Sequence, residues 1–191
     1  MRTPGSAVTA AEVVRALPGD DLVPDAIEQM DRAATFAVPV ETLWPWVVQL
    51  GKDRAGWYLP RSVEALVPRS RRAIRHIDPR WQDVVVGTEV GDWGPGDPVL
   101  RAAVVDAPHA LVWHSVRDRA NGHRWPADPA EPAALAISWT LALRCVPGGS
   151  RLHHRLRIRA KHAALVKIGG VFDRLTVVGM FRGLRERVEQ R

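Results

Sequence analysis

The chain reads PVETLWPWVVQLGKDRAGWY over residues 39–58, and this stretch sets the pattern of the fold. Its apolar residues recur at spacings of three and four: Leu43, Trp46, Val47 and Leu50. This period predicts one buried stripe on an amphipathic helix. Pro39 and Glu41 suit the first helical turn, and Gly51 ends the helix. The segment holds three of the eight tryptophans and the only tyrosine. Aromatic rings where a helix meets a loop are typical of a small-molecule cleft.

The sequence downstream changes to the period of strands. Pro147-Gly148-Gly149 joins two long strands, predicted at 134–146 and 150–160, and is a strong hairpin signal. Strands are predicted at four further places: 30–38, 84–90, 98–106 and 110–117. Short helices are predicted at 9–16 and 60–67. Three prolines and many charges in 118–133 indicate a long loop.

The last 30 residues return to a helical period. One apolar stripe runs through Leu165, Ile168, Phe172, Leu175, Val178, Phe181, Leu184 and Val188. An antiparallel sheet must bury one face, and this is the only long apolar stripe that can cover it. The sequence therefore predicts an α+β fold in which a curved antiparallel sheet wraps around a long C-terminal helix, with two short helices after the first strand.

Alternation along the strands assigns their side chains to two faces. The predicted inward set is Leu135, Ile137, Trp139, Leu141, Leu143, Leu152, His154, Leu156 and Ile158. Trp113 is expected to point inward with Leu111 and Ser115, although His114 with Val112 and Val116 fits the pattern nearly as well. The arginines at 151, 155, 157 and 159 share the opposite face, which predicts a solvated outer surface.

Composition excludes several classes of protein. The net charge is +6, but the tryptophans lie apart from the basic strand, so a nucleic-acid surface is not expected. No apolar run approaches the roughly 20 residues that span a bilayer, so no membrane insertion is expected. The N-terminal sequence lacks the apolar segment of a secretory signal, and a single cysteine, Cys145, cannot form an internal disulfide. A soluble, cytoplasmic protein is the expectation.

Four stretches carry a resemblance to a known family: LPGDDLVP at 17–24, WPWVVQLG with RAGWY within 44–58, WQD with VGTEV within 81–90, and FRGLRERVE at 181–189. With these the chain resembles the START-like (SRPBCC) superfamily, and in particular its bacterial polyketide cyclase/dehydrase-like branch. The resemblance spans nearly the whole chain and implies a helix-grip fold with an internal ligand cavity. Residues 28–191 would form the ligand-binding domain. Residues 1–27, rich in Pro, Gly, Ala and Asp, would form an N-terminal surface arm.

Six residues are candidates for the cavity lining: Trp57, Tyr58, Trp81, Trp113, Trp139 and His154. The resemblance places the loop of Trp57 and Tyr58 near the cavity mouth, although both rings could instead pack the helix–loop junction. Trp93 lies in a Gly/Pro turn and is expected to lie apart from the cavity. His154 is the polar member of an apolar strand face. It could orient a ligand, act as an acid or base, or satisfy a backbone group nearby.

Three functions remain open from the sequence. The leading one is binding of a small hydrophobic ligand, aromatic or polyketide-like in character. The second is a cyclase or dehydratase with His154 as base, which needs a second polar group from Ser115, Gln49 or Arg54. The third is a partner-binding module whose interior is filled by large side chains. No cofactor is expected. No metal is expected either, because the adjacent His153 and His154 face opposite sides of a strand.

Overall fold

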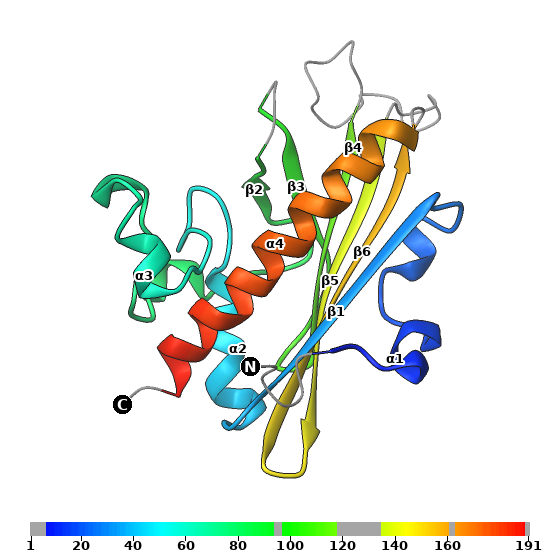
Figure 1. The fold of residues 1–191 in the computed structure, drawn as a ribbon. Coiled ribbons are helices and arrows are strands. Elements are labelled where there is room, and N and C mark those ends of the chain that lie inside the picture. The colour runs from blue at the N-terminus through cyan, green and yellow to red at the C-terminus, as the bar shows by residue number, and fades with distance from the viewer. Residues whose placement is uncertain (1–6, 94–96, 118–134, 161–162, 190–191) are drawn as a thin grey trace.

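A computed structural model of the chain describes residues 7–93, 97–117, 135–160 and 163–189. Within them, six antiparallel strands form one sheet in the order β1-β6-β5-β4-β3-β2 (Figure 1). The strands are β1 Glu28–Phe36, β2 Glu89–Gly91, β3 Val99–Asp106, β4 Ala110–Arg117, β5 Leu135–Val146 and β6 Gly149–Ala160. The predicted loop 118–133 lies outside the described residues.

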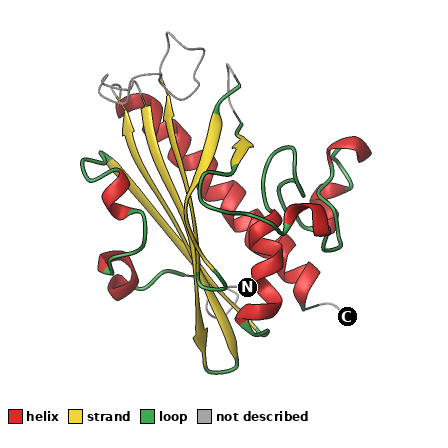
Figure 2. Ribbon diagram, turned by 180° about the vertical axis from the view of Figure 1, so that it is seen from behind, coloured by secondary structure: helices red, strands yellow, loops and turns green. Residues whose placement is uncertain are grey.

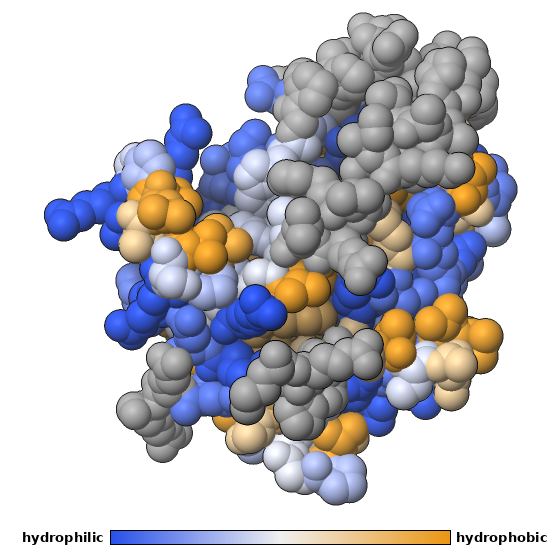
Figure 3. Space-filling model, viewed as in Figure 1, coloured by the Kyte–Doolittle hydropathy of each residue, from blue (hydrophilic) through white to orange (hydrophobic). Residues whose placement is uncertain are grey.

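One long helix, α4 (Ala163–Val188), crosses the inner face of this sheet, and residues 7–27 lie on the opposite, outer face (Figures 1 and 2). The shorter helices are α1 Ala10–Val14, α2 Val40–Gln49 and α3 Arg61–Glu64, with 3₁₀ turns η1 Asp20–Leu22, η2 Arg69–Arg71 and η3 Pro79–Trp81. The predicted α+β helix-grip fold is therefore confirmed. Figure 3 shows that the hydrophobic residues on one face of the molecule form separate groups among hydrophilic ones.

The register of the β5–β6 hairpin sets the inner face. Trp139 pairs with Leu156, and Leu141 pairs with His154. Both pairs belong to the predicted inward set. The strand predicted at 84–90 is wrong over most of its length, because β2 begins only at Glu89. A turn precedes it: the Thr88 amide donates to the Val85 carbonyl, and Gly87 adopts a φ of 93° that favours glycine.

The buried stripe of α4 contains Phe181, Leu184 and Val188 as predicted, but not Val178. Five residues of α4 are buried in the core that this helix shares with the sheet and α2: Val177, Met180, Phe181, Leu184 and Val188. Val178 was predicted in the stripe, but 39% of its surface is exposed. A residue next to Val177 in a helix points about 100° away from it, so both cannot face the sheet. The side chains of Leu165, Ile168, Phe172 and Leu175 lie outside the described residues.

The outer face of the sheet is covered rather than solvated. Arg151 and Arg155 are only 7% and 2% exposed, so the prediction of a solvated basic face is wrong for these two residues. The guanidinium of Arg151 donates to both carboxylate oxygens of Glu12 in α1. Arg155 donates to the carboxylates of Asp31 and Asp20 and to backbone carbonyls of residues 12, 13 and 15. The arginines therefore hold the N-terminal segment against the sheet.

The contact between α4 and the loop before α3 is closest at Gly183. A Cβ atom at this position would lie 2.5 Å from the carbonyl carbon of Leu59 and 2.6 Å from its amide nitrogen. One turn earlier, a Cβ atom at Gly179 would meet only the Leu59 side chain, at 3.2 Å. The glycine at 183 is therefore required by the approach of two backbones, whereas the one at 179 faces a side chain that can move.

We expect Gly183→Ala to lower the free energy of unfolding by about 1–3 kcal/mol, because the new methyl group must push two backbones apart. This loss occurs despite the better helix propensity of alanine, worth about 1 kcal/mol. Urea denaturation measures the difference. Gly179→Ala is the matched control and should be neutral or stabilising. Equal free energies for the two variants would contradict the close backbone contact.

Candidate ligand-binding cavity

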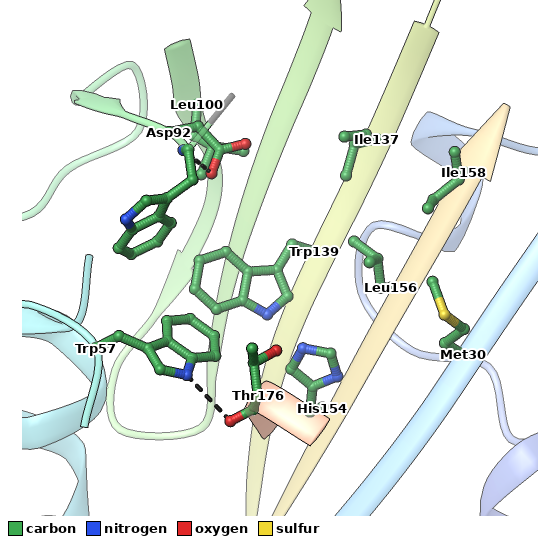
Figure 4. Close-up of a pocket in the computed structure, with 11 residues that line it drawn as sticks. Met30, Trp57, Asp92, Leu100, Ile137, Trp139, His154, Leu156, Ile158 and Thr176 are labelled. Atoms are coloured by element: carbon green, nitrogen blue, oxygen red, sulfur yellow. Dashed lines mark hydrogen bonds between the residues drawn. The ribbon is translucent and has the colours of Figure 1, made fainter. Parts of the chain in front are cut away.

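A cavity of about 240 Å³ lies between the inner face of the sheet and α4. Most of its lining is apolar or aromatic, and the residues come from four strands (β1, β3, β5 and β6), the loop after α2, the segment after β2 and α4 (Figure 4). The lining residues are Met30, Trp57, Asp92, Trp93, Leu100, Ile137, Trp139, His154, Leu156, Ile158 and Thr176. Its volume is below the range of about 300–1,000 Å³ typical of drug-sized ligands, so a small ligand fits it best.

Three tryptophans form the aromatic wall of the cavity. The Trp57 ring lies 5.5 Å from that of Trp93, at an interplanar angle of 86°. It lies 5.9 Å from the Trp139 ring, at an angle of 35°. The Nε1 of Trp57 donates to the backbone carbonyl of Thr176 at 3.0 Å, which ties this wall to α4 (Figure 4). These flat surfaces favour a planar, apolar ligand.

Asp92 provides the charged part of the lining. Its carboxylate pairs with the nearly buried guanidinium of Arg117 and also accepts the Trp93 amide at 2.7 Å. The backbone carbonyl of Asp92 accepts a hydrogen bond from Lys52 at 3.0 Å. Since Asp92 is already paired, its charge positions the segment that carries Trp93. This segment lies at the cavity edge, where Trp93 is 46% exposed.

His154 lies at the inner end of the cavity and is 1% exposed. Its ring centroid lies 6.1 Å from that of Trp139. Burial, together with the smaller effects of the charges of Arg32 and His153, lowers the pKa of His154 to about 3. A backbone hydrogen bond and Asp31 oppose these effects. The imidazole is therefore neutral at pH 7.

The cavity brings together three of the six residues predicted to line it: Trp57, Trp139 and His154. Tyr58 does not line it, because its side chain is fully buried under α2 and its hydroxyl donates to the Trp46 carbonyl. Burial raises the pKa of Tyr58. Trp113 is also fully buried in the core, beside Trp139, with which it pairs across β4 and β5.

Trp81 lies outside the cavity because it belongs to a separate polar cluster. Its ring lies under the guanidinium groups of Arg54 and Arg80, at 5.1 and 5.5 Å from the ring centroid. Arg54 also donates to the Trp81 carbonyl at 2.6 Å. Trp81 therefore braces the loop after α2 instead of facing a ligand.

The sequence reasoning missed five lining residues: Met30, Asp92, Trp93, Leu100 and Thr176. The expectation that Trp93 lies apart from the cavity is wrong, because the Asp92–Arg117 ion pair directs this segment back toward the sheet. Alternation along β1 could have found Met30, which pairs with Leu156. Nothing in the local pattern marks Thr176.

Within the described residues, no group of three or more His, Cys, Asp and Glu side chains is placed to hold a metal ion. No helix among those residues is both long enough and apolar enough to cross a bilayer.

Comparisons with known proteins bear on the fold. Neither the protein-family models nor the curated proteins include a match to this sequence. Many solved structures are similar, among them the following three. Protein CV1439 from Chromobacterium violaceum is 12% identical with a TM-score of 0.53, and MLL2253 from Mesorhizobium loti is 14% identical with a TM-score of 0.50; each comparison covers 85% of this chain and 98% of the other. Ms6760 from Mycobacterium smegmatis is 17% identical with a TM-score of 0.50, over 84% of this chain and 90% of that one. Such distant likeness establishes a shared fold.

We expect His154 to make the free energy of unfolding depend on pH. The folded-state pKa is lowered to about 3, whereas the pKa of an unperturbed histidine is 6.5. As the pH falls below about 6.5, the unfolded chain binds a proton that the folded chain does not. The contribution is therefore fully present above this pH and is lost progressively toward pH 3, by up to about 1.4 kcal/mol per pH unit.

Urea denaturation between pH 7 and pH 5 measures this slope, in a range above the titration of most carboxylates. His154→Gln, which does not titrate, should flatten it. His109→Gln, at an exposed histidine in the β3–β4 turn, is the control and should leave it unchanged. An unaltered slope in His154→Gln would show that His154 is not buried in its neutral form.

Proposed function

We propose that this protein binds a small hydrophobic molecule, aromatic or polyketide-like in character, in the cavity between its sheet and α4. The observation that carries the proposal is the cavity itself, of about 240 Å³, with a wall of three tryptophans and several aliphatic side chains. The resemblance of the sequence to the polyketide cyclase/dehydrase-like branch supports the same ligand class. Residues 28–191 would form the binding domain, and residues 1–27 would form the arm on its outer face.

Burial of apolar surface would provide most of the affinity. Each Å² of apolar surface removed from water contributes about 25 cal/mol before the costs of association. Flat rings can stack on Trp57 and Trp139, which are inclined by only 35° to each other. The few polar atoms of the lining would then orient the ligand.

An enzymatic role with His154 as general base has less support. A base works best when its pKa lies near the operating pH, whereas burial lowers the pKa of His154 to about 3. Among the residues that the structure describes, none of the three polar groups expected to assist it lines the cavity. Ser115 donates to the Val99 carbonyl, Gln49 binds the backbone of residues 76 and 78, and Arg54 binds two backbone carbonyls. These contacts favour binding over catalysis.

A partner-binding module with a filled interior also has less support. It requires large side chains to occupy the space under α4, and a cavity is present there. The cytoplasm remains the proposed location. It is supported by the single cysteine, Cys145, which is exposed and unpaired at the end of β5 and which a reducing compartment would protect.

A cavity-filling substitution tests the proposed binding. Leu156→Phe adds an aromatic ring to a lining residue, and we expect it to reduce the affinity for a flat apolar probe such as anthracene at least about tenfold. Tryptophan fluorescence measures saturable binding at one site per chain. Val86→Phe adds the same ring to a residue that is 65% exposed and outside the lining, so it should leave the affinity unchanged. Equal affinities of the two variants would contradict the site.

His154→Gln separates a carrier from a catalyst. In a carrier the glutamine retains hydrogen-bonding atoms, so affinity should fall by no more than about tenfold, the net value of one hydrogen bond. In an enzyme the loss of the proton-transfer group should reduce turnover by about 10²–10⁴-fold, with binding nearly intact. We expect the carrier pattern. Turnover of a polyketide-like substrate that disappears in His154→Gln while binding persists would overturn it.

A further inference from the structure

The indole nitrogen of Trp139 is the distinctive polar atom of the cavity. The residue is 6% exposed, and its Nε1 has no hydrogen-bond acceptor among the residues that the structure describes. Figure 4 shows this nitrogen directed toward the side of the cavity where His154 and Thr176 lie. A buried N–H group without an acceptor costs about 1–3 kcal/mol. A ligand atom that accepts its hydrogen bond would remove this cost, and the affinity for that ligand would rise.

The indole N–H group of the neighbouring Trp57, in contrast, has a hydrogen-bond acceptor. The Nε1 of Trp57 already donates to the Thr176 carbonyl at 3.0 Å, so it holds α4 and does not need a ligand. Trp113, across the β4–β5 pair from Trp139, also has a buried Nε1 without an acceptor among the described residues, but it does not line the cavity. Trp139 alone among these three combines an available N–H group with a place in the cavity wall.

We propose that Trp139 selects ligands that carry an uncharged carbonyl oxygen, which accepts the Nε1–H at the inner end of the cavity while the planar apolar body lies against the tryptophans. The inference rests on the proposed function, because it assigns an orientation to the ligand of the same cavity. Trp139 would then determine ligand specificity in addition to forming part of the cavity wall.

The carbonyl is uncharged because the lining residues that the structure describes offer no free positive charge to an anion. Asp92 is the ionised residue of the lining, and its charge is neutralised by Arg117. His154 is neutral at pH 7 because burial lowers its pKa to about 3. Arg32, opposite His154 in the β1–β6 pair, does not line the cavity and donates to the Asp31 carbonyl at 2.6 Å. An ionised carboxylate would therefore be desolvated without a cation to compensate it.

Three matched naphthalenes test this inference by tryptophan fluorescence or calorimetry: methyl naphthyl ketone, ethylnaphthalene and naphthoate at pH 7. The first two differ only in the carbonyl oxygen. We expect the ketone to bind about three- to tenfold more tightly than the hydrocarbon, as one net hydrogen bond predicts. Naphthoate should bind more weakly than the ketone.

Trp139→Phe keeps an aromatic ring in the wall but removes the N–H group. It should bring the ratio of ketone to hydrocarbon affinity close to one, because any loss of stacking surface affects both probes alike. Trp113→Phe is the matched control, because it removes an equivalent buried N–H group outside the cavity. It should leave the ratio unchanged.

The outcomes separate this inference from the proposed function. If ethylnaphthalene binds saturably but the ratio in the wild type is one, or if Trp139→Phe leaves a ratio above one intact, the role of Trp139 is refuted and the hydrophobic site stands. If naphthoate binds more tightly than the ketone, the preference for an uncharged ligand is refuted. If none of the three probes binds, the proposed function itself fails.

Discussion

The guanidinium group of Arg187 holds the cavity wall together. Its side chain is fully buried near the C-terminal end of α4, where it pairs with Glu64 at 2.6 Å. It also donates to the backbone carbonyls of residues 59, 73, 74 and 183 and lies 4.6 Å above the Tyr58 ring. Burial lowers the pKa of Arg187 and Glu64 opposes that shift. Because removal of one partner from such a buried network typically costs about 3–5 kcal/mol, α4 and the loop of residues 57–74 are held as one unit. Trp57, next to Tyr58 in that loop, is therefore fixed where it can face the cavity.

A second buried network of ion pairs holds the N-terminal segment against the outer face of the sheet. Glu12 is 2% exposed, and its contacts with Arg151 lower its pKa well below the usual range. Asp31 accepts hydrogen bonds from Arg155 and His153, which hold its pKa low against the effect of burial. Much of the positive charge of the basic strand is thus used inside the molecule, to attach residues 7–27. This arrangement gives the four arginines of β6 partners within the protein itself.

The strand pattern is enough to predict the inner face, because alternation in a paired hairpin leaves only two choices for each side chain. It correctly places Trp139 and His154 together, on neighbouring strands with their rings 6.1 Å apart. Alternation along a strand does not show whether its polar face contacts water or another segment of the chain. The contact of the N-terminal segment with Arg155 was therefore not predictable from the strand alone. Trp93 was missed for a related reason. Its position depends on the ion pair between Asp92 and Arg117, which are 25 residues apart in the sequence. Contacts of this kind leave no local period.

The two charge networks also determine the chemistry of the space between them. Carboxylates and guanidinium groups are concentrated where segments join, and the arginines there are saturated by partners on the protein. Apart from Thr176 and the carboxylate of Asp92, which is paired with Arg117, the described lining of the cavity has apolar side chains, a neutral imidazole and the indole nitrogen of Trp139. In such surroundings each unmatched donor has a large effect, since the low local dielectric strengthens a hydrogen bond that is made and penalises one that is not. Affinity can then come from apolar area common to many ligands, while discrimination among them depends on very few atoms.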